Sequence, residues 1–416
     1  MLPLYGCGKS FKYSEKSICG GNKMTYHLYG DGIHDDYPAI QELLDSGICE
    51  IVLPVPSKNY VISKTLKIHS NQALKLPRFA LIRLADRANC EMIENEDFDH
   101  FSENILIDGG IWDMNHSAQW PNPYHFPDEN GLYFFDKMGF EYRDFSRFST
   151  LKTLSHQAYT GHCMRFCRVR RFILKNITIR NPVVYGVQMA HIEDFSIQDI
   201  LFEYTEGSPK LWNMDGVHIE GYCKNGTVTN LKGACHDDLL ALTADDSLYG
   251  PIENILVDGI FAEGSHSAVR LLSHGFPVKN VTIRNVFGSY YVYCIGLTKY
   301  HGGEEERGVM ENIVIENVFA SSCEGTADVK GGRYPLLWVQ KGVDVEGLGI
   351  YNVHRVEKKN PTPLLRVDSG ATVKNLRLCD IYQKSELREP LPFLCLDGDV
   401  EVSIEKNLQN YYQDKV

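Results

Sequence analysis

The stretch from Asn254 to Gly259, Asn-Ile-Leu-Val-Asp-Gly, carries the pattern that decides the fold. It returns 26 residues later as Asn-Val-Thr-Ile-Arg-Asn-Val from Asn280. After another 32 residues it returns as Asn-Ile-Val-Ile-Glu-Asn-Val from Asn312. Each copy alternates apolar and polar residues, which is the period of a β-strand with one buried face. A strand phrase that recurs at such intervals predicts a solenoid of stacked coils.

Similar phrases flank these three copies. They begin at Asn104, Phe172, Phe195 and Gly226, and weaker ones lie near Val343, Ala371 and Val400. A two-sheet sandwich would require evenly spaced hairpin turns, and only Asn225-Gly226 offers one. Helical periodicity is almost absent from this half of the chain, so no helix is available for crossovers. We therefore predict an all-β, single-stranded parallel β-helix of about ten coils, with the recurrent Asn or Asp stacked at a bend.

The whole chain, residues 1–416, is predicted to form a single β-helix domain. Residues 1–50 form its N-terminal cap region, which contains an amphipathic helix at 36–46 with Asp36 as the N-cap. Residues 112–162 break the repeat and are rich in Trp, Tyr, Phe and His, which predicts an irregular insertion that lines a groove. The alternative is a loop that only packs on the coils. Residues 325–416 form the C-terminal coils.

Composition narrows the range of partners. The formal net charge of −12 argues against nucleic acid and anionic membranes, because both select for a basic surface. No apolar run is long enough for a signal peptide or a membrane span. The twelve cysteines include no Cys-x-x-Cys pair, so we expect reduced thiols rather than a zinc site. The expected location is the cytoplasm.

Three carboxylates are predicted to converge on one flank of the solenoid. Asp237 and His266 are 29 residues apart, as are the phrase starts Asn225 and Asn254, so they occupy equivalent places on consecutive coils, about 4.8 Å apart. Asp215 precedes the strand of the coil before. Asp238 joins the group if the chain bends there, since adjacent residues on a strand point to opposite faces. Hydrolysis of an acetal needs one protonated acid and one carboxylate that activates water.

Two sets of motifs resemble a known family. The entry from Gly30 to Asp36, Gly-Asp-Gly-Ile-His-Asp-Asp, resembles the first turn of pectin-lyase-like β-helix proteins. Asn-Met-Asp-Gly at 213–216, His-Asp-Asp at 236–238 and, loosely, Ser-His-Ser at 265–267 resemble the catalytic phrases of glycoside hydrolase family 28, which contains polygalacturonases. The resemblance implies a right-handed β-helix and an inverting mechanism without metal or organic cofactor. It also implies that Asp237 is the general acid, that Asp215 and Asp238 hold the water, and that His266 orients the cluster.

The chain departs from that family in the residues expected to bind substrate. The Arg-Ile-Lys phrase that grips a substrate carboxylate is absent, and Gly-Leu-Thr-Lys-Tyr at 296–300 stands one coil later. Lys299 and Arg270 are the candidates for that role, with Tyr300 beside them. His218 takes a place where family members often have an acid, and Trp212 is a candidate for stacking on a sugar ring.

Three functions remain open. The first is a glycoside hydrolase, exo-acting, on a pectin-like, possibly uronate-containing, oligosaccharide. The second is a polysaccharide lyase on the same fold, in which the aspartates would bind calcium. The third is a solenoid that binds carbohydrate without turnover. The specific match of the two Asp phrases favours the hydrolase.

Overall fold

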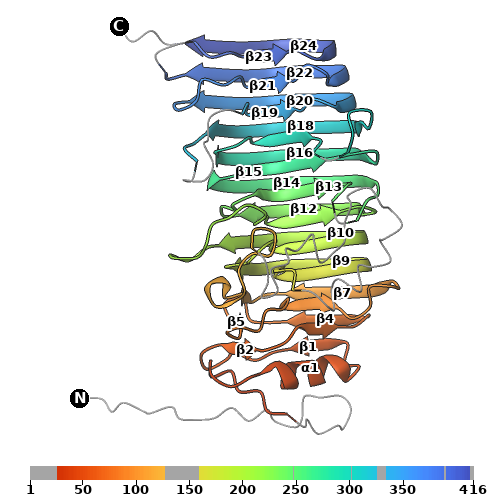
Figure 1. Ribbon diagram of the computed structural model, residues 1–416, viewed down its shortest axis with the longest axis vertical. Coiled ribbons are helices and arrows are strands. Elements are labelled where there is room, and N and C mark those ends of the chain that lie inside the picture. Colours follow the sequence, from red (N-terminus) through yellow and green to blue (C-terminus); the bar gives the residue numbers. More distant parts are fainter. Residues whose placement is uncertain are drawn as a thin grey trace, which may run out of the picture.

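The chain forms a right-handed parallel β-helix in a computed structural model that describes residues 26–126, 159–246, 248–300, 302–325, 334–387 and 390–412 (Figure 1). Every strand pairing within these ranges is parallel, and the coils stack from α1 at one end to β24 at the other. The predicted all-β solenoid is confirmed. Among the described residues, no helix is long and apolar enough to cross a membrane.

The strands stack on three faces of the coil. The first face, called the site sheet below, contains β3 (Leu66–Ile68), β6 (Ile93–Asn95), the starts of β9 (Met164–Arg180) and β10 (Val187–Glu203), β11 (Val217–Glu220), β13 (Asp238–Thr243), β15 (Ser267–Leu272), β17 (Ile295–Thr298), β19 (Leu337–Val339), β21 (Leu365–Val367) and β23 (Leu394–Leu396).

The second face holds the recurring phrase. It contains the later parts of β9 and β10 together with β1 (Glu50–Val52), β4 (Gln72–Lys75), β7 (Ser102–Asp108), β12 (Lys224–Lys232), β14 (Ile252–Ser265), β16 (Pro277–Tyr290), β18 (Gly308–Ser322), β20 (Val343–Glu357), β22 (Thr372–Ser385) and β24 (Asp399–Tyr412). These twelve stacked strands compare with about ten predicted coils. On the third face, β2 (Tyr60–Ile62), β5 (Leu81–Leu84) and β8 (Ile111–Asp113) lead onto the end of β9.

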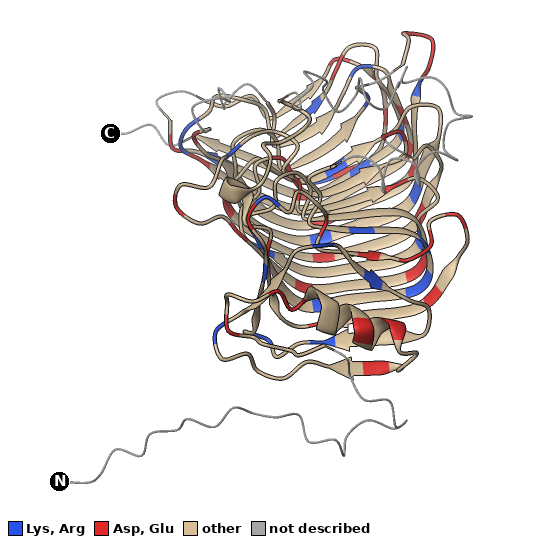
Figure 2. Ribbon diagram, turned by 60° about the horizontal axis from the view of Figure 1, so that its bottom comes forward, with Lys and Arg blue, Asp and Glu red and all other residues tan. Residues whose placement is uncertain are grey.

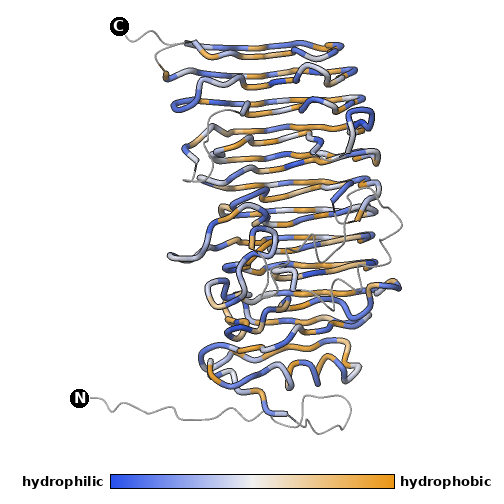
Figure 3. Tube along the Cα trace, viewed as in Figure 1, coloured by the Kyte–Doolittle hydropathy of each residue, from blue (hydrophilic) through white to orange (hydrophobic). Residues whose placement is uncertain are grey.

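The core is a set of apolar columns that run along the solenoid axis. In the recurring phrase, Ile255 pairs with Val281 and Val281 with Ile313, and all three side chains are buried. The alternating colours along each coil in Figure 3 show the same period of two. Burial of each such side chain stabilises the fold by roughly 1.5–3 kcal/mol. The outer faces carry both signs of charge (Figure 2), and ion pairs such as that of Arg284 with Asp258 join neighbouring coils.

Side-chain ladders mark the bends, as predicted. Asn254, Asn280 and Asn312 adopt left-handed backbone conformations, and each Nδ2 donates to the Oδ1 of the residue one coil earlier. A second ladder includes Asn285, whose Nδ2 donates to Asp258 and whose Oδ1 accepts from Asn317. Asn and Asp tolerate positive φ better than other side chains do. This explains why the repeat requires these residues at its bends.

Asn285 allows the two contributions of a ladder residue to be separated. Its φ is 60°, so we expect Asn285→Ala to lower the free energy of unfolding by about 1–3 kcal/mol, through backbone strain and two lost hydrogen bonds. Asn285→Gly relieves the strain but still loses the bonds, so its cost is predicted to be smaller. Denaturant unfolding of both variants checks this. Equal costs would mean that the backbone conformation contributes nothing.

The helix α1 (Tyr37–Asp45) covers the first coil, as predicted for the cap region. Ala39, Ile40, Leu43 and Leu44 form its buried face. Asp36 is the N-cap residue, as predicted, but its side chain makes no capping hydrogen bond to the helix. That carboxylate instead accepts hydrogen bonds from the backbone N–H groups of Tyr29, Gly30 and Val61, because it is fully buried and these donors close the entry loop onto β2.

Candidate active site

The predicted catalytic residues lie at the same end of three neighbouring strands of the site sheet. Asp215 precedes β11, Asp238 opens β13, and His266 immediately precedes β15. Asp238 pairs with Ser267 across the coils, and the backbone N–H of Gly216 donates to the carbonyl of Asp238 at 2.9 Å. The side chains that the 29-residue spacing placed together are therefore together in the structure.

The bend proposed at Asp237 and Asp238 is present, and the two carboxylates share one site. One carboxylate oxygen of each aspartate and one ring nitrogen of His266 lie within 4.8 Å of one another. Asp237 accepts a hydrogen bond from the backbone N–H of Asn213 at 2.9 Å, and its Oδ1 lies 3.6 Å from Nδ1 of His266. Its side chain is 14% exposed, whereas that of Asp238 is fully buried. Asp237 is thus the carboxylate nearest to solvent.

Asp238 is held by hydroxyl groups from the next two coils. The hydroxyl of Ser267 donates to its Oδ1, and the hydroxyl of Tyr293 lies 3.4 Å from the same oxygen. Because desolvation penalises the charged form, burial raises the pKa of Asp238, against the opposing effect of Arg270. Burial and then repulsion by Asp237 raise the pKa of Asp215 to about 7. The cluster therefore retains a shared proton up to near neutral pH.

Arg270 points at the carboxylates. It pairs along the site sheet with Ala241 and Gly296, whose small side chains leave room for it. Its Nε lies 2.7 Å from Oδ2 of Asp238, and its Nη2 lies 4.0 Å from Oδ2 of Asp215. The guanidinium therefore supplies the positive charge among these aspartates, where the lyase hypothesis would place calcium.

Lys299 and Tyr300 lie beyond the end of β17. The ammonium of Lys299 donates to the carbonyl of Gly303 at 2.9 Å, within its own loop. The ring of Tyr300 is about half exposed and lies 5.7 Å from the guanidinium carbon of Arg270. Tyr300 thus borders the cluster, while the ammonium of Lys299 is hydrogen-bonded to the backbone of its own loop.

Trp212 lies at the surface next to the cluster. Its side chain is half exposed, and its carbonyl accepts hydrogen bonds from Asn122 at 3.2 Å and His125 at 3.1 Å. These two residues belong to the predicted insertion at 112–162, of which residues 127–158 lie outside the described ranges. The described part of the insertion therefore contacts the segment that carries Trp212.

His218, predicted to bind substrate, is fully buried below the surface of the site. Its Nδ1 lies 2.6 Å from Oδ2 of Asp215, and its ring stacks on Tyr185 at 4.0 Å with an interplanar angle of 3°. The ring of His162, from the end of the insertion, stacks on the other side of Tyr185 at 4.7 Å. His218 thus contacts Asp215 and not the open face of the cluster.

Two further acids, which were not among the predicted site residues, belong to this region. Asp246 lies 3.3 Å from Nε2 of His218, and Asp245 is fully buried, with neither carboxylate oxygen hydrogen-bonded within the described ranges. Burial and repulsion by Asp246 raise the pKa of Asp245 to about 8. Asp245 and Asp246 follow β13, which pairs with the strand that contains His218. This position in the sequence could have predicted that they lie near the site.

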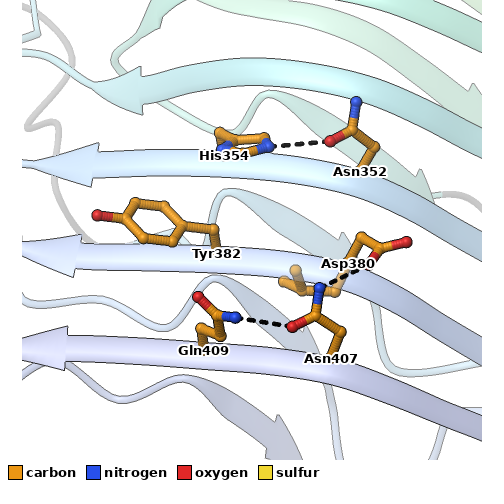
Figure 4. Close-up of a pocket in the computed structure, with 7 residues that line it drawn as sticks. Asn352, His354, Asp380, Tyr382, Asn407 and Gln409 are labelled. Carbon is orange, nitrogen blue, oxygen red and sulfur yellow. Dashed lines mark hydrogen bonds between the residues drawn. The ribbon is translucent and has the colours of Figure 1, made fainter.

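A separate pocket of about 280 Å³ lies on β20, β22 and β24 (Figure 4). Its polar side chains are largely bonded to one another: Asn407 donates to Asp380, and Gln409 donates to Asn407. Nε2 of His354 lies 2.9 Å from the side-chain Oδ1 of Asn352. This arrangement continues the ladders of the solenoid and offers no acid cluster, so the site sheet remains the candidate active site.

Comparisons with known proteins support the fold. No protein-family profile matches the sequence, and no curated protein is significantly similar to it. Among solved structures, a hyperthermoactive exopolygalacturonase from Thermotoga maritima matches with a TM-score of 0.61 and 17% identity, over 91% of this chain and 89% of that one. A family 28 exopolygalacturonase from Yersinia enterocolitica matches with a TM-score of 0.55 and 16% identity, over 91% and 77% of the two chains.

Proposed function

We propose that this protein is a glycoside hydrolase that cleaves a pectin-like oligosaccharide with inversion. In the proposed exo mode, each cut removes the terminal unit. The observation that carries the proposal is the meeting of Asp215, Asp237 and Asp238 at the ends of adjacent strands. The structural neighbours named above, which are exopolygalacturonases, support the same reaction class.

In the proposed mechanism, Asp237 protonates the leaving oxygen, because it is the most exposed of the three carboxylates. Asp215 and Asp238 orient and deprotonate the attacking water. Oδ1 of Asp215 is buried and has no hydrogen-bond partner among the described residues, so it can accept from that water. His266, whose Nδ1 lies 3.6 Å from Oδ1 of Asp237, orients the carboxyl group of that acid.

The test is a panel of pectin-derived oligosaccharides, with products resolved by chromatography and proton NMR. A hydrolase that inverts gives an initial product of opposite anomeric configuration, and exo action releases one small product from the start. An unsaturated uronate product together with loss of activity in chelator would instead indicate a lyase. Binding without any product would indicate a sugar-binding solenoid.

Activity is predicted to fall as the pH rises through about 7. Because the carboxylates interact, the pKa of about 7 at Asp215 marks the pH above which the cluster gives up its shared proton. Acid catalysis needs this proton on Asp237, while Asp215 is ionised. At lower pH, a second loss is expected when the water-activating carboxylate becomes protonated, which gives a bell-shaped profile. Initial rates across the pH range check this. An alkaline limit well above pH 9 would contradict a carboxyl acid.

A further inference from the structure

Behind the catalytic cluster, an unbroken chain of contacts runs from Asp215 through His218 to Asp246. Nδ1 of His218 lies 2.6 Å from Asp215, and Nε2 lies 3.3 Å from Oδ2 of Asp246 and 3.1 Å from the hydroxyl of Thr243. That hydroxyl donates to the carbonyl of Ile219 at 3.1 Å, so its oxygen is free to accept from the ring. Both ring nitrogens therefore face acceptors, which requires a doubly protonated, charged imidazole.

The surroundings of His218 favour the same charged form. Glu220 lies 3.9 Å from Nε2, and the stacked Tyr185 ring presents its electron-rich face to the imidazolium. Farther away, His162 lies beyond Tyr185, and burial lowers its pKa, so it stays neutral. Arg270 faces Asp215 from the opposite side. The hydrogen bonds to Asp215 and Asp246 raise the pKa of His218 to about 10, in spite of its burial.

We propose that Asp246 is a positioning residue that acts through His218 to hold Asp215 ionised and correctly oriented for its role with the attacking water. This inference rests on the hydrolase proposed above. Burial and the neighbouring Asp237 both favour the neutral form of Asp215, and the imidazolium opposes them. Asp246 in turn provides the counter-charge that keeps a fully buried imidazole protonated. Its own side chain is 21% exposed and stands one imidazole away from the reacting groups.

The test compares Asp246→Asn with Asp246→Glu, using Asp344→Asn as a control on the distant β20. In Asp246→Asn, NMR of histidine-labelled protein is expected to show His218 titrating at lower pH than in the wild type. Hydrolysis is expected to show a roughly ten- to hundredfold lower kcat with KM nearly unchanged, the range for losing a hydrogen bond to a charged group. Asp246→Glu should recover much of both properties.

The NMR arm needs no substrate, so it separates this inference from the proposed function. An unchanged His218 titration in Asp246→Asn would overturn the inference even if the wild type is a hydrolase. A rise in KM with unchanged kcat would also overturn it, because Asp246 would then be a substrate contact. If the wild type hydrolyses nothing but His218 titrates lower in the variant, the proposed reaction fails while the coupling of Asp246 to His218 stands. Circular dichroism confirms that each variant is folded.

Discussion

Replacing Asp237 with Asn should lower kcat by about 10²- to 10⁴-fold, the contribution of a general acid, while KM changes little. The amide keeps the shape of the carboxyl group, and its oxygen can still accept from the N–H of Asn213. It cannot protonate a leaving oxygen. Steady-state kinetics on the best natural oligosaccharide provide the measurement.

The leaving group distinguishes lost acid catalysis from general damage. A glycoside with an acidic phenol as leaving group needs little protonation, so Asp237→Asn should retain much more of its activity on that substrate. Loss of the water-activating group, in Asp215→Asn, should slow both substrates alike. Near-normal turnover of the natural substrate by Asp237→Asn would show that Asp237 is not the acid, and the assignment would have to move to another carboxylate.

The spacing of the repeat was sufficient to predict the coils and the register of the catalytic residues. Because one coil stacks directly on the next, an interval of 29 residues between Asp237 and His266 becomes lateral contact. The same logic placed Asp215 one coil earlier. The Asn ladders were predictable for a related reason, since a residue type that recurs at every bend points to a shared backbone conformation.

The buried residues behind the catalytic cluster could not be predicted from the sequence. The residues of β11 alternate in direction, yet all four are buried. Tyr185 stacks on His218, and Tyr124 and His162 of the insertion pack against Tyr185. His218 therefore contacts Asp215 where a one-sided strand would have exposed it. No local pattern distinguishes a covered strand from an open one. Asp245 and Asp246 were missed because an acidic pair after a strand is also typical of a solvated turn.

Replacing Arg270 with Ala should reduce both kcat and stability, and this outcome separates two roles for the residue. If Arg270 held a substrate carboxylate, as its place in the sequence suggested, the main change would be a higher KM. The structure instead places the guanidinium 2.7 Å from Asp238 and 4.0 Å from Asp215, with only 15% of the side chain exposed. Removal would leave the buried Asp238 without its counter-charge.

Loss of one partner of a buried ion pair typically costs about 3–5 kcal/mol, so a clear fall in the midpoint of thermal unfolding is expected. The pKa of Asp238 should rise further, because Arg270 opposes the effect of burial. More of the variant's carboxylates would then be protonated at a given pH, and the acidic limb of the rate profile should move to higher pH. Arg270→Lys keeps the charge without the planar fork and should fall between the wild type and Arg270→Ala. The opposite outcome is a variant that unfolds like the wild type, with kcat unchanged and only KM raised. It would show that Arg270 binds the substrate, and the expected ligand would then be an anionic sugar.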